Sequence, residues 1–111
     1  MTYKPFSVIV VPFPFTDKSN TKNRPALVIS DLEHLQHTGH VTCLMITSAK
    51  NSSWPNDHLI QDLKTAGLAT PSIIRQKIFT LDARLIKKTI GKLSLPEQKI
   101  ILSCMKKHLI T

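Results

Sequence analysis

The side chains best suited to chemistry in this chain are one arginine and two hydroxyls, each at the end of an apolar run. Arg24 stands at the far end of a polar, basic connection, just before the apolar run Ala26–Ile29. Thr47 and Ser48 close a later apolar run. A guanidinium offers a fork of donors that matches phosphate oxygens, and a hydroxyl adds another hydrogen bond. If the two runs are neighbouring strands, Arg24 and Thr47 form a phosphate site; taken singly, they are a surface charge and an ordinary strand residue.

Other kinds of chemistry find little support in the sequence. It has no Walker loop, no G-x-G-x-x-G, no H-E-x-x-H and no zinc-type cysteine pattern. With only three glycines, the chain cannot build a glycine-rich phosphate cradle. His34, His37 and His40 have a spacing that would suit a metal, but their polar surroundings favour surface histidines on a loop. The carboxylates form no obvious acid–base pair. We therefore expect no metal and no cofactor.

The charge of the chain indicates an anionic partner. Its 111 residues hold 15 Lys and Arg against 7 Asp and Glu, a net charge of +8. An excess of this size causes self-repulsion in the compact state and says more about partners than about fold. Nucleic acid, an acidic protein and an anionic membrane are the candidates, and plain solubility is the alternative. We favour nucleic acid or an acidic protein. The length predicts one domain over residues 1–111.

Compartment is indicated by the cysteines and by the N-terminal segment. Cys43 and Cys104 lie in apolar stretches and form no C-x-x-C pair, which fits a reducing cytosol better than a disulfide scaffold. The short apolar run near the N-terminus is broken by prolines, unlike a signal peptide. No stretch approaches the roughly 20 apolar residues that a membrane span needs. We expect a cytoplasmic protein with no membrane partner.

Hydrophobic periodicity predicts short strands followed by one helix. The continuous, β-branched run Val8–Phe13 indicates a strand buried on both faces. The pattern predicts a small, strongly bent sheet or barrel, mainly β, with a C-terminal helix packed on it. Further strands are expected at Pro25–Ser30, Val41–Ile46, Ser72–Leu81 and Ile86–Leu93, with a short edge strand at His58–Leu63, a helical turn or loop at Asp31–Gly39, and turns at Lys64–Pro71 and near Asp82.

The C-terminal helix has a recognisable start. Ser94, Pro96 and Glu97 have the spacing of a capping box, with Ser94 as N-cap. Apolar and other residues then recur at three- and four-residue spacing, which predicts one packed helix face. That face comprises Ile100, Ile101, Cys104, Met105 and His108.

Several ordered blocks of the sequence together resemble one family. The blocks are VIVVPFPFTD, NRPALVIS, MITS, AGLATPSIIRQKIFTLD and IGKLS, followed by the final helix. From Val8 to Leu109 the chain is similar to the PemK/MazF toxins of type II toxin–antitoxin modules. The resemblance implies an SH3-like barrel, shared with gyrase-poisoning toxins, and a homodimer. It also implies metal-independent cleavage of single-stranded RNA, and an antitoxin whose acidic tail covers the RNA site.

The resemblance also implies roles for individual residues. The family's R-P arginine corresponds to Arg24, and its threonine at the end of the third strand corresponds to Thr47; these would be the catalytic residues. Phe6-Ser7 stands where the family usually has Gly-Asp. Phe13 or Phe15 is a candidate for stacking a base. The implied RNA-binding residues are Lys18, Ser19, Asn20, Thr21 and Lys22, in a loop that closes over the RNA, with Ser48, Arg75 and Lys77.

Two alternatives of a different kind remain. The chain could be a non-catalytic homologue that binds an antitoxin and, through that complex, operator DNA as a co-repressor. It could also be a gyrase poison on the same fold. The Arg24–Thr47 pair favours the nuclease, because neither alternative requires it.

Overall fold

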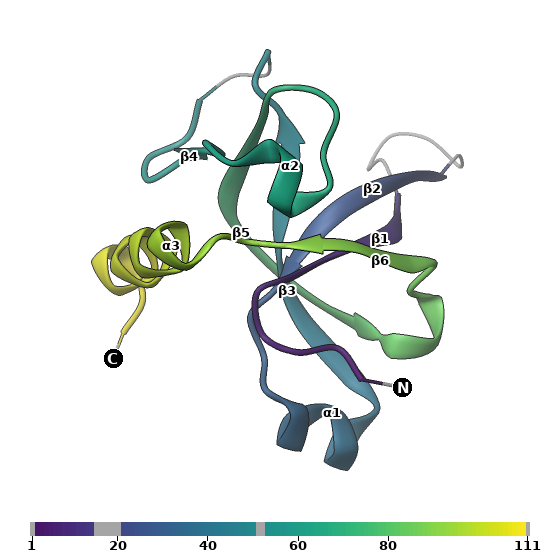
Figure 1. Cartoon of the computed structure of the whole chain (residues 1–111). Helices are drawn as coiled ribbons and strands as arrows, with labels where there is room; N and C mark the ends of the chain where they lie inside the picture. The colour runs from purple at the N-terminus through teal and green to yellow at the C-terminus, as the bar shows by residue number, and fades with distance from the viewer. Residues whose placement is uncertain (1, 15–20, 51–52, 111) are drawn as a thin grey trace.

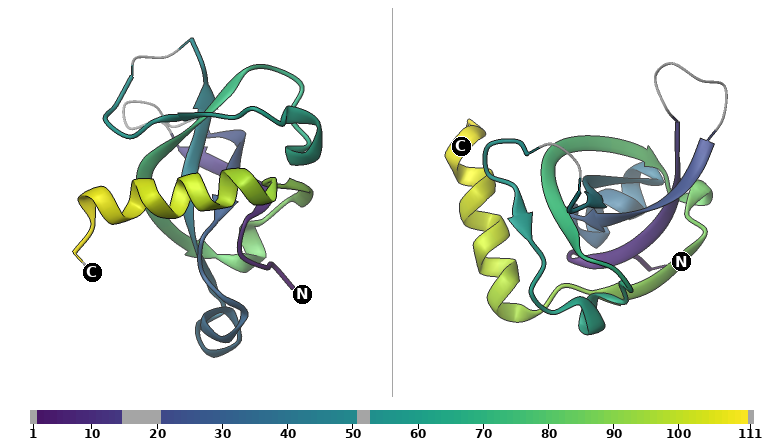
Figure 2. Two further views of the ribbon diagram at one scale, coloured as in Figure 1. Left: turned by 60° about the vertical axis from the view of Figure 1, so that its left-hand side comes forward. Right: turned by 90° about the horizontal axis from the view of Figure 1, so that it is seen from above.

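A six-stranded antiparallel sheet forms the body of the protein (Figure 1). The structure is a computed structural model that describes residues 2–14, 21–50 and 53–110. The strand order is β4-β5-β3-β2-β1-β6. Seen from above, the sheet curls into a half-barrel (Figure 2). The strands are β1 (Ser7–Pro14), β2 (Thr21–Val28), β3 (His40–Ser48), β4 (His58–Leu59), β5 (Ser72–Asp82) and β6 (Lys88–Lys92).

Short helices connect the strands, and one longer helix runs across a side of the curled sheet (Figure 2). The connection after β2 is a true helix, whose N-cap Asp31 accepts a hydrogen bond from His34 N at 2.8 Å. None of the helices in the described ranges has the length and apolarity that crossing a bilayer requires. The helices are α1 (Leu32–Thr38), α2 (Leu63–Ala66), the 3-10 turn η1 (Ala83–Leu85) and α3 (Leu95–His108).

The predicted fold class, mainly β with a C-terminal helix, is confirmed, and several strand boundaries differ. β2 begins at Thr21 and not at Pro25, because its first residues pair with the end of β1. β4 stops at Leu59, since Asp62 caps α2 by accepting from Thr65 N. β6 begins at Lys88 and not at Ile86, because Ile86 caps η1 by donating its backbone N–H to Ala83 O.

The core lies on both faces of the central strands. Val8, Leu27 and Leu44 belong to one buried cluster, which also contains Ile101 of α3. Ile9 and Cys43 belong to a second cluster on the opposite face. Because consecutive strand residues point to opposite faces, β1 is buried on both, as its continuous apolar run predicts. Burial raises the pKa of the Cys43 thiol to about 12, so this cysteine is an inert apolar side chain.

Phe6, just before β1, adopts a backbone conformation that favours glycine. Its φ is 69°, in the left-handed region, which costs a non-glycine residue about 1–3 kcal/mol. Its N–H donates to Val28 O at 2.7 Å, and its carbonyl accepts from Leu93 N at 2.9 Å. Its ring packs against the first core cluster. The replacement of the expected Gly-Asp by Phe6-Ser7 therefore leaves a glycine-like turn, with ring burial offsetting the strain.

Glu97 does not close the predicted capping box. Ser94 makes no side-chain hydrogen bond to the helix backbone, and its hydroxyl donates to Glu97 Oε1 at 3.0 Å. The buried carboxylate also accepts from Gln61 N at 2.9 Å and Asp62 N at 3.0 Å, while His58 Nε2 lies 2.6 Å from Oε2. Desolvation raises the pKa of Glu97, but these hydrogen bonds outweigh it and hold the pKa below its ordinary value. Glu97 thus joins α3 to the segment between β4 and α2.

The packed face of α3 is narrower than predicted. Ile101 and Cys104 are buried, and Met105 is partly buried against the first core cluster. Ile100 is 43% exposed, because it lies on the edge of the helix that the sheet does not reach. His108 is also exposed, and its Nε2 lies 2.8 Å from Gln76 Oε1.

Two glycines bring the backbones of α2 and β6 into direct contact. A Cβ added to Gly67 would lie 2.0 Å from Ile90 O, and one added to Gly91 would lie 2.5 Å from Thr65 O. Gly67 also has a left-handed φ of 75° and ends α2. No side chain larger than hydrogen fits at this contact, so both glycines are required for packing.

We expect Gly91→Ala to lower the free energy of unfolding by about 3 kcal/mol, because its methyl group meets backbone atoms that cannot rotate away. Urea denaturation followed by circular dichroism measures the change. Gly39→Ala is the matched control: Gly39 has a φ of 72° and open space around it, so it carries only backbone strain of about 1–2 kcal/mol. Equal losses in the two variants would contradict the close-contact explanation.

Glu97 should make stability depend on pH in the acid range. Its folded-state pKa is below the ordinary value of 4.5, so its contribution is present above that value and is lost as pH falls through the folded-state pKa. In urea titrations, Glu97→Gln should be less stable than wild type near neutrality, and the gap should shrink with acidification. Glu33→Gln on the exposed surface of α1 is the control. A gap that stays constant with pH would show that the carboxylate charge is not what these hydrogen bonds stabilise.

Candidate functional site

The register between β2 and β3 brings the two predicted catalytic residues to one place on the sheet. Ala26 lies opposite Met45 in this antiparallel pair, at the last position of the ladder. Continuing the same register sets Arg24 opposite Thr47, and opposite residues share a sheet face. Arg24 is half-buried and Thr47 is buried, with 4% of its surface exposed. Two polar side chains therefore sit at the point where β2 and β3 separate.

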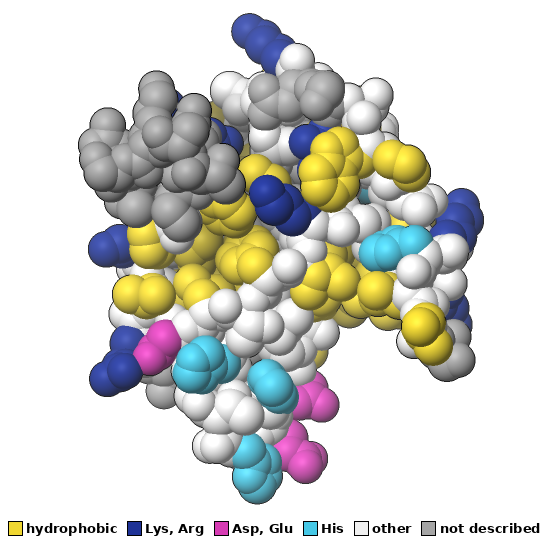
Figure 3. Space-filling view, turned by 180° about the vertical axis from the view of Figure 1, so that it is seen from behind, with side chains coloured by type: hydrophobic (Ala, Val, Ile, Leu, Met, Phe, Trp, Pro, Cys, Tyr) yellow, Lys and Arg dark blue, Asp and Glu magenta, His cyan; other side chains and the backbone are white. Residues whose placement is uncertain are grey.

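An aromatic and basic surface adjoins this pair. Phe13 lies opposite Lys22 in the β1–β2 register, and Val11 lies opposite Arg24, so Phe13 shares the face of Arg24. The Phe13 ring meets Phe79 edge-on at 5.2 Å, and Lys77 Nζ lies 5.6 Å from the Phe13 ring centre. Exposed apolar and basic side chains gather together on this side of the molecule (Figure 3). An open groove of about 410 Å³ is lined by Pro12, Phe13, Lys77, Phe79, Thr80, Leu81 and Leu85.

Arg75 lies on the same face but is engaged within the protein. It sits opposite Met45 in the β3–β5 register and is 6% exposed. Its Nε donates to Asp57 Oδ1 at 3.2 Å and its Nη2 donates to Asp57 Oδ2 at 3.0 Å. Its guanidinium carbon lies 5.0 Å from the centre of the Trp54 ring. Arg75 therefore organises the segment before β4, a role that its charge alone did not indicate.

Trp54 is a residue of this face that the sequence reasoning missed. Its backbone N–H donates to Asp57 Oδ2 at 2.8 Å, and 42% of its surface is exposed. The available signal was the single tryptophan of the chain, followed by a proline in a polar segment. In the sequence, this segment cannot be distinguished from an ordinary loop. Only the folded structure shows that Asp57 and Arg75 hold it in place.

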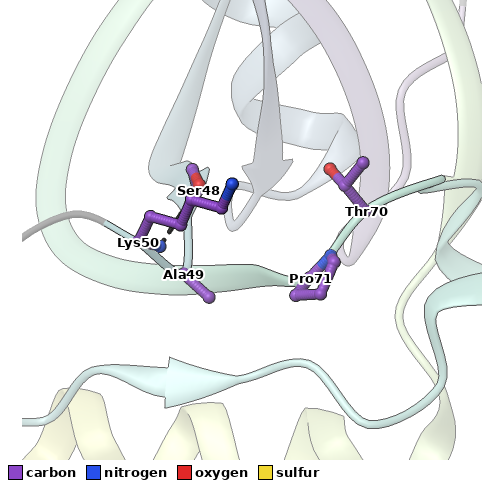
Figure 4. A pocket seen from close by; sticks show the side chains of 5 residues that line it. All are labelled: Ser48, Ala49, Lys50, Thr70 and Pro71. Atoms are coloured by element: carbon purple, nitrogen blue, oxygen red, sulfur yellow. Dashed lines mark hydrogen bonds between the residues drawn. The ribbon is translucent and has the colours of Figure 1, made fainter.

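Ser48 borders a second hollow, just beyond Thr47. Because strand side chains alternate, Ser48 points to the opposite face from Thr47. Its Oγ accepts a hydrogen bond from Lys50 N at 3.2 Å. The hollow has a volume of about 350 Å³ and lies between the end of β3 and the start of β5 (Figure 4). Its lining consists of Ser48, Ala49, Lys50, Thr70 and Pro71.

The remaining predicted residues are distributed as follows. Lys22 is exposed on β2, and Thr21 opens that strand. Phe15, Lys18, Ser19 and Asn20 lie outside the described residues.

The three regularly spaced histidines lie apart from this site. His34 and His37 belong to α1, which stands at the opposite end of the sheet from β4 and α2 (Figures 1 and 3). His40 begins β3, and its Nδ1 lies 2.9 Å from Thr38 O. All three are exposed, as predicted for surface histidines. Within the ranges that the structure describes, no cluster of three His, Cys, Asp or Glu residues could hold a metal ion.

Several solved structures share this fold. An endoribonuclease in complex with its cognate antitoxin, from a mycobacterial species, has a TM-score of 0.73 at 14% identity and covers 96% of this chain and 93% of its own. The toxin MazF-mt6 of Mycobacterium tuberculosis has a TM-score of 0.73 at 17% identity, covering 91% and 93%. A MazE–MazF structure from Deinococcus radiodurans has a TM-score of 0.70 at 16% identity, covering 95% and 91%. At these identities the likeness concerns the fold.

Sequence comparison gives the family. Among curated proteins, no sequence matches this chain. The family model described as "PemK-like, MazF-like toxin of type II toxin-antitoxin system" matches residues 4–109. Since this match covers nearly the whole chain, the protein belongs to the PemK-like, MazF-like toxins of type II toxin–antitoxin systems.

Proposed function

We propose that this toxin is a metal-independent endoribonuclease that cuts single-stranded mRNA in the cytoplasm. The observation that carries the proposal is the β2–β3 register, which, continued beyond its last pair of Ala26 and Met45, sets Arg24 opposite Thr47 on a basic and aromatic sheet face of a chain from this toxin family. The solved structures of similar fold include proteins described as endoribonucleases. An RNA strand supplies the phosphate that the Arg24–Thr47 pair fits.

The proposed reaction is attack by a ribose 2′-hydroxyl on the adjacent phosphorus. A bond forms from the 2′-oxygen to phosphorus as the bond to the 5′-oxygen breaks. The 2′-hydroxyl gives up its proton to solvent water, and the 5′-oxygen leaves with a proton donated by Arg24, which regains one from solvent. Negative charge builds on the phosphoryl oxygens, where fixed donors stabilise it. Arg24 acts as stabiliser and proton donor; it is not the base, because a guanidinium is already protonated and has no acceptor atom. Thr47 donates a hydrogen bond to a non-bridging oxygen. These side chains carry the reaction without a cofactor.

The rest of the strand is bound by charge and by polar contacts along the same face. Lys22 and Lys77 are exposed beside Phe13, where they can contact successive phosphates. The net charge of +8 supports an extended anionic ligand. The full proposed RNA-binding set is Lys18, Ser19, Asn20, Thr21, Lys22, Arg75 and Lys77, together with Ser48, which lies at the end of β3 on the opposite face.

The proposed protein partners are an antitoxin with an acidic tail and a second copy of the chain, with operator DNA bound through the antitoxin complex. The positive charge of the site suits an acidic tail as well as RNA. One structure of similar fold is described as bound to its cognate antitoxin. A second copy would cover apolar side chains that this protomer exposes, among them Leu59, Ile78, Leu85, Leu95, Ile100 and Leu102.

We expect a homodimer at micromolar concentration, because pairing removes exposed apolar side chains from water. Light scattering coupled to size-exclusion chromatography gives the mass directly, to compare with 12.5 kDa for one chain. A monomer throughout that concentration range would count against the dimer.

Arg24→Ala and Thr47→Ala should each reduce RNA cleavage by about 10²–10³-fold, because each removes a donor to the developing charge. The assay incubates a long single-stranded RNA in EDTA and maps cuts by primer extension. Thr47→Ser, which keeps the hydroxyl, should retain most activity. Both alanine variants should also lose the ability to arrest growth.

Matched controls separate loss of chemistry from loss of fold. Arg84→Ala removes an exposed arginine paired with Asp82, and Thr42→Ala removes a threonine from the same strand as Thr47. Both should cleave like wild type. If the two site variants also cleaved like wild type, the site would be wrong. If folded wild-type protein made no cuts, the binding-only homologue would be the better description.

A further inference from the structure

We propose that Trp54 is a stacking platform for one unpaired base of the RNA, held in position by the buried Arg75–Asp57 ion pair. The inference rests on the proposed function, since it assigns a base-binding residue to the same site. The toxin would then hold its substrate by a nucleobase as well as by phosphates.

The Trp54 ring is exposed and yet firmly held. The Arg75 guanidinium carbon lies 5.0 Å from its ring centre, and the two-point contact with Asp57 holds that guanidinium in place. The backbone N–H of Trp54 also donates to Asp57 Oδ2 at 2.8 Å, which anchors the main chain that carries the ring. Despite this, 42% of the residue remains accessible. An ordinary surface tryptophan needs no such support, whereas a platform must keep its ring surface ready for a ligand.

Burying the Arg75–Asp57 ion pair costs desolvation free energy, which is a considerable burden on the stability of a small protein. The Arg75 and Asp57 side chains are 8% and 11% exposed, so both charges lose most of their water. The desolvation of two charges can exceed their mutual attraction, so a buried pair is weak evidence for a stabilising role. A pair that fixes an exposed aromatic ring in one orientation is better explained by pre-organised binding.

The position of the platform fits a base close to the reacting phosphate. Arg75 lies opposite Met45 on β3, and Thr47 is the next residue of β3 on the same face. Trp54 therefore stands over a neighbouring position of the face that carries Thr47 and Arg24. A strand whose phosphate lies between Arg24 and Thr47 can place a flanking base on the Trp54 ring.

The chemistry of this surface selects a base and not an acidic peptide. A tryptophan ring offers a flat π surface on which any unpaired base can stack, whereas its electron-rich face repels a carboxylate, which could bind only at the indole N–H. One side of the ring is occupied by a guanidinium, which leaves the remainder for the ligand. The other aromatic ring of this face, Phe13, already contacts Phe79 and Lys77.

The test measures binding of the RNA sequence cut by the wild type, prepared with 2′-O-methyl groups throughout so that it has no attacking hydroxyl. Trp54 is the single tryptophan of the chain, so its fluorescence reports on this ring alone. We expect quenching as RNA saturates the protein. Fluorescence anisotropy of labelled RNA gives the affinity, which Trp54→Ala should weaken roughly 5- to 150-fold, the range for loss of one aromatic–base stack. Trp54→Phe should keep most of the affinity, and Trp54→Leu should not.

Two further variants complete the test. Ile110→Ala removes another exposed apolar side chain, beyond the end of α3, and should bind like wild type. Asp57→Asn weakens the ion pair with Arg75 and so loosens the Trp54 ring without removing it. This variant should bind RNA more weakly than wild type while its thermal unfolding remains cooperative. RNA that binds without quenching, or that binds Trp54→Ala as tightly as wild type, overturns the platform and leaves the nuclease proposal intact. A wild type that neither binds nor cuts RNA overturns both.

Discussion

The functional face depends on the register of β3 with its two neighbours. Pairing with β2 ends at Ala26 and Met45, in a register that leads Arg24 toward Thr47, and pairing with β5 sets Arg75 opposite Met45. Side chains alternate along a strand, so a slip of one residue would send one member of each pair to the other face. The buried residues of both core clusters prevent such a slip, because Leu44 and Cys43 would exchange environments. The same apolar pattern that folds the sheet therefore also assembles the polar site.

The carboxylates of Asp57 and Glu97 hold the segment around β4 in place. Asp57 lies in this segment, and Glu97 reaches the segment from α3. Asp57 binds Arg75 and the backbone of Trp54, while the next residue, His58, contacts Glu97 at the start of α3. β4 itself is only His58–Leu59 and has few ladder hydrogen bonds. Side-chain interactions thus supply the order that a longer strand would have provided. The C-terminal helix and the exposed tryptophan are joined through this short segment.

Much of the fold could be predicted from the sequence because its signals are local. The continuous run in β1, the turn at Asp82 and the change of period at α3 each lie within a few residues. Glu97 shows where such reasoning fails: its spacing from Ser94 indicates a cap, but its partners Gln61 and Asp62 are brought close only by folding. The prediction that Ile100 is packed was wrong for a related reason. Periodicity identifies an apolar helix face, but it does not show how much of that face the sheet covers.

The candidate site was predictable only in part. Arg24 and Thr47 were identified by residue type and by resemblance, and the β2–β3 register leads toward such a pair without including it. Trp54 was not identified, because its importance depends on Asp57 and Arg75, which lie in different segments. A charged residue in a sequence does not reveal whether its partner will be a ligand or another side chain. Arg75 was expected to face the RNA directly, and the structure gives it an internal partner as well.

The close backbone contacts between α2 and β6, at Gly67 with Ile90 and at Gly91 with Thr65, affect how the edge of the sheet avoids pairing with another chain. β4 and β6 are the two edges of the sheet, and the curl brings them toward each other without pairing them. An unpaired edge is a template onto which another chain can add a strand. Here α2 packs its backbone against β6 at Gly91 and obstructs that edge. The close packing at these glycines therefore covers the free edge of β6 and protects the sheet from edge-to-edge aggregation.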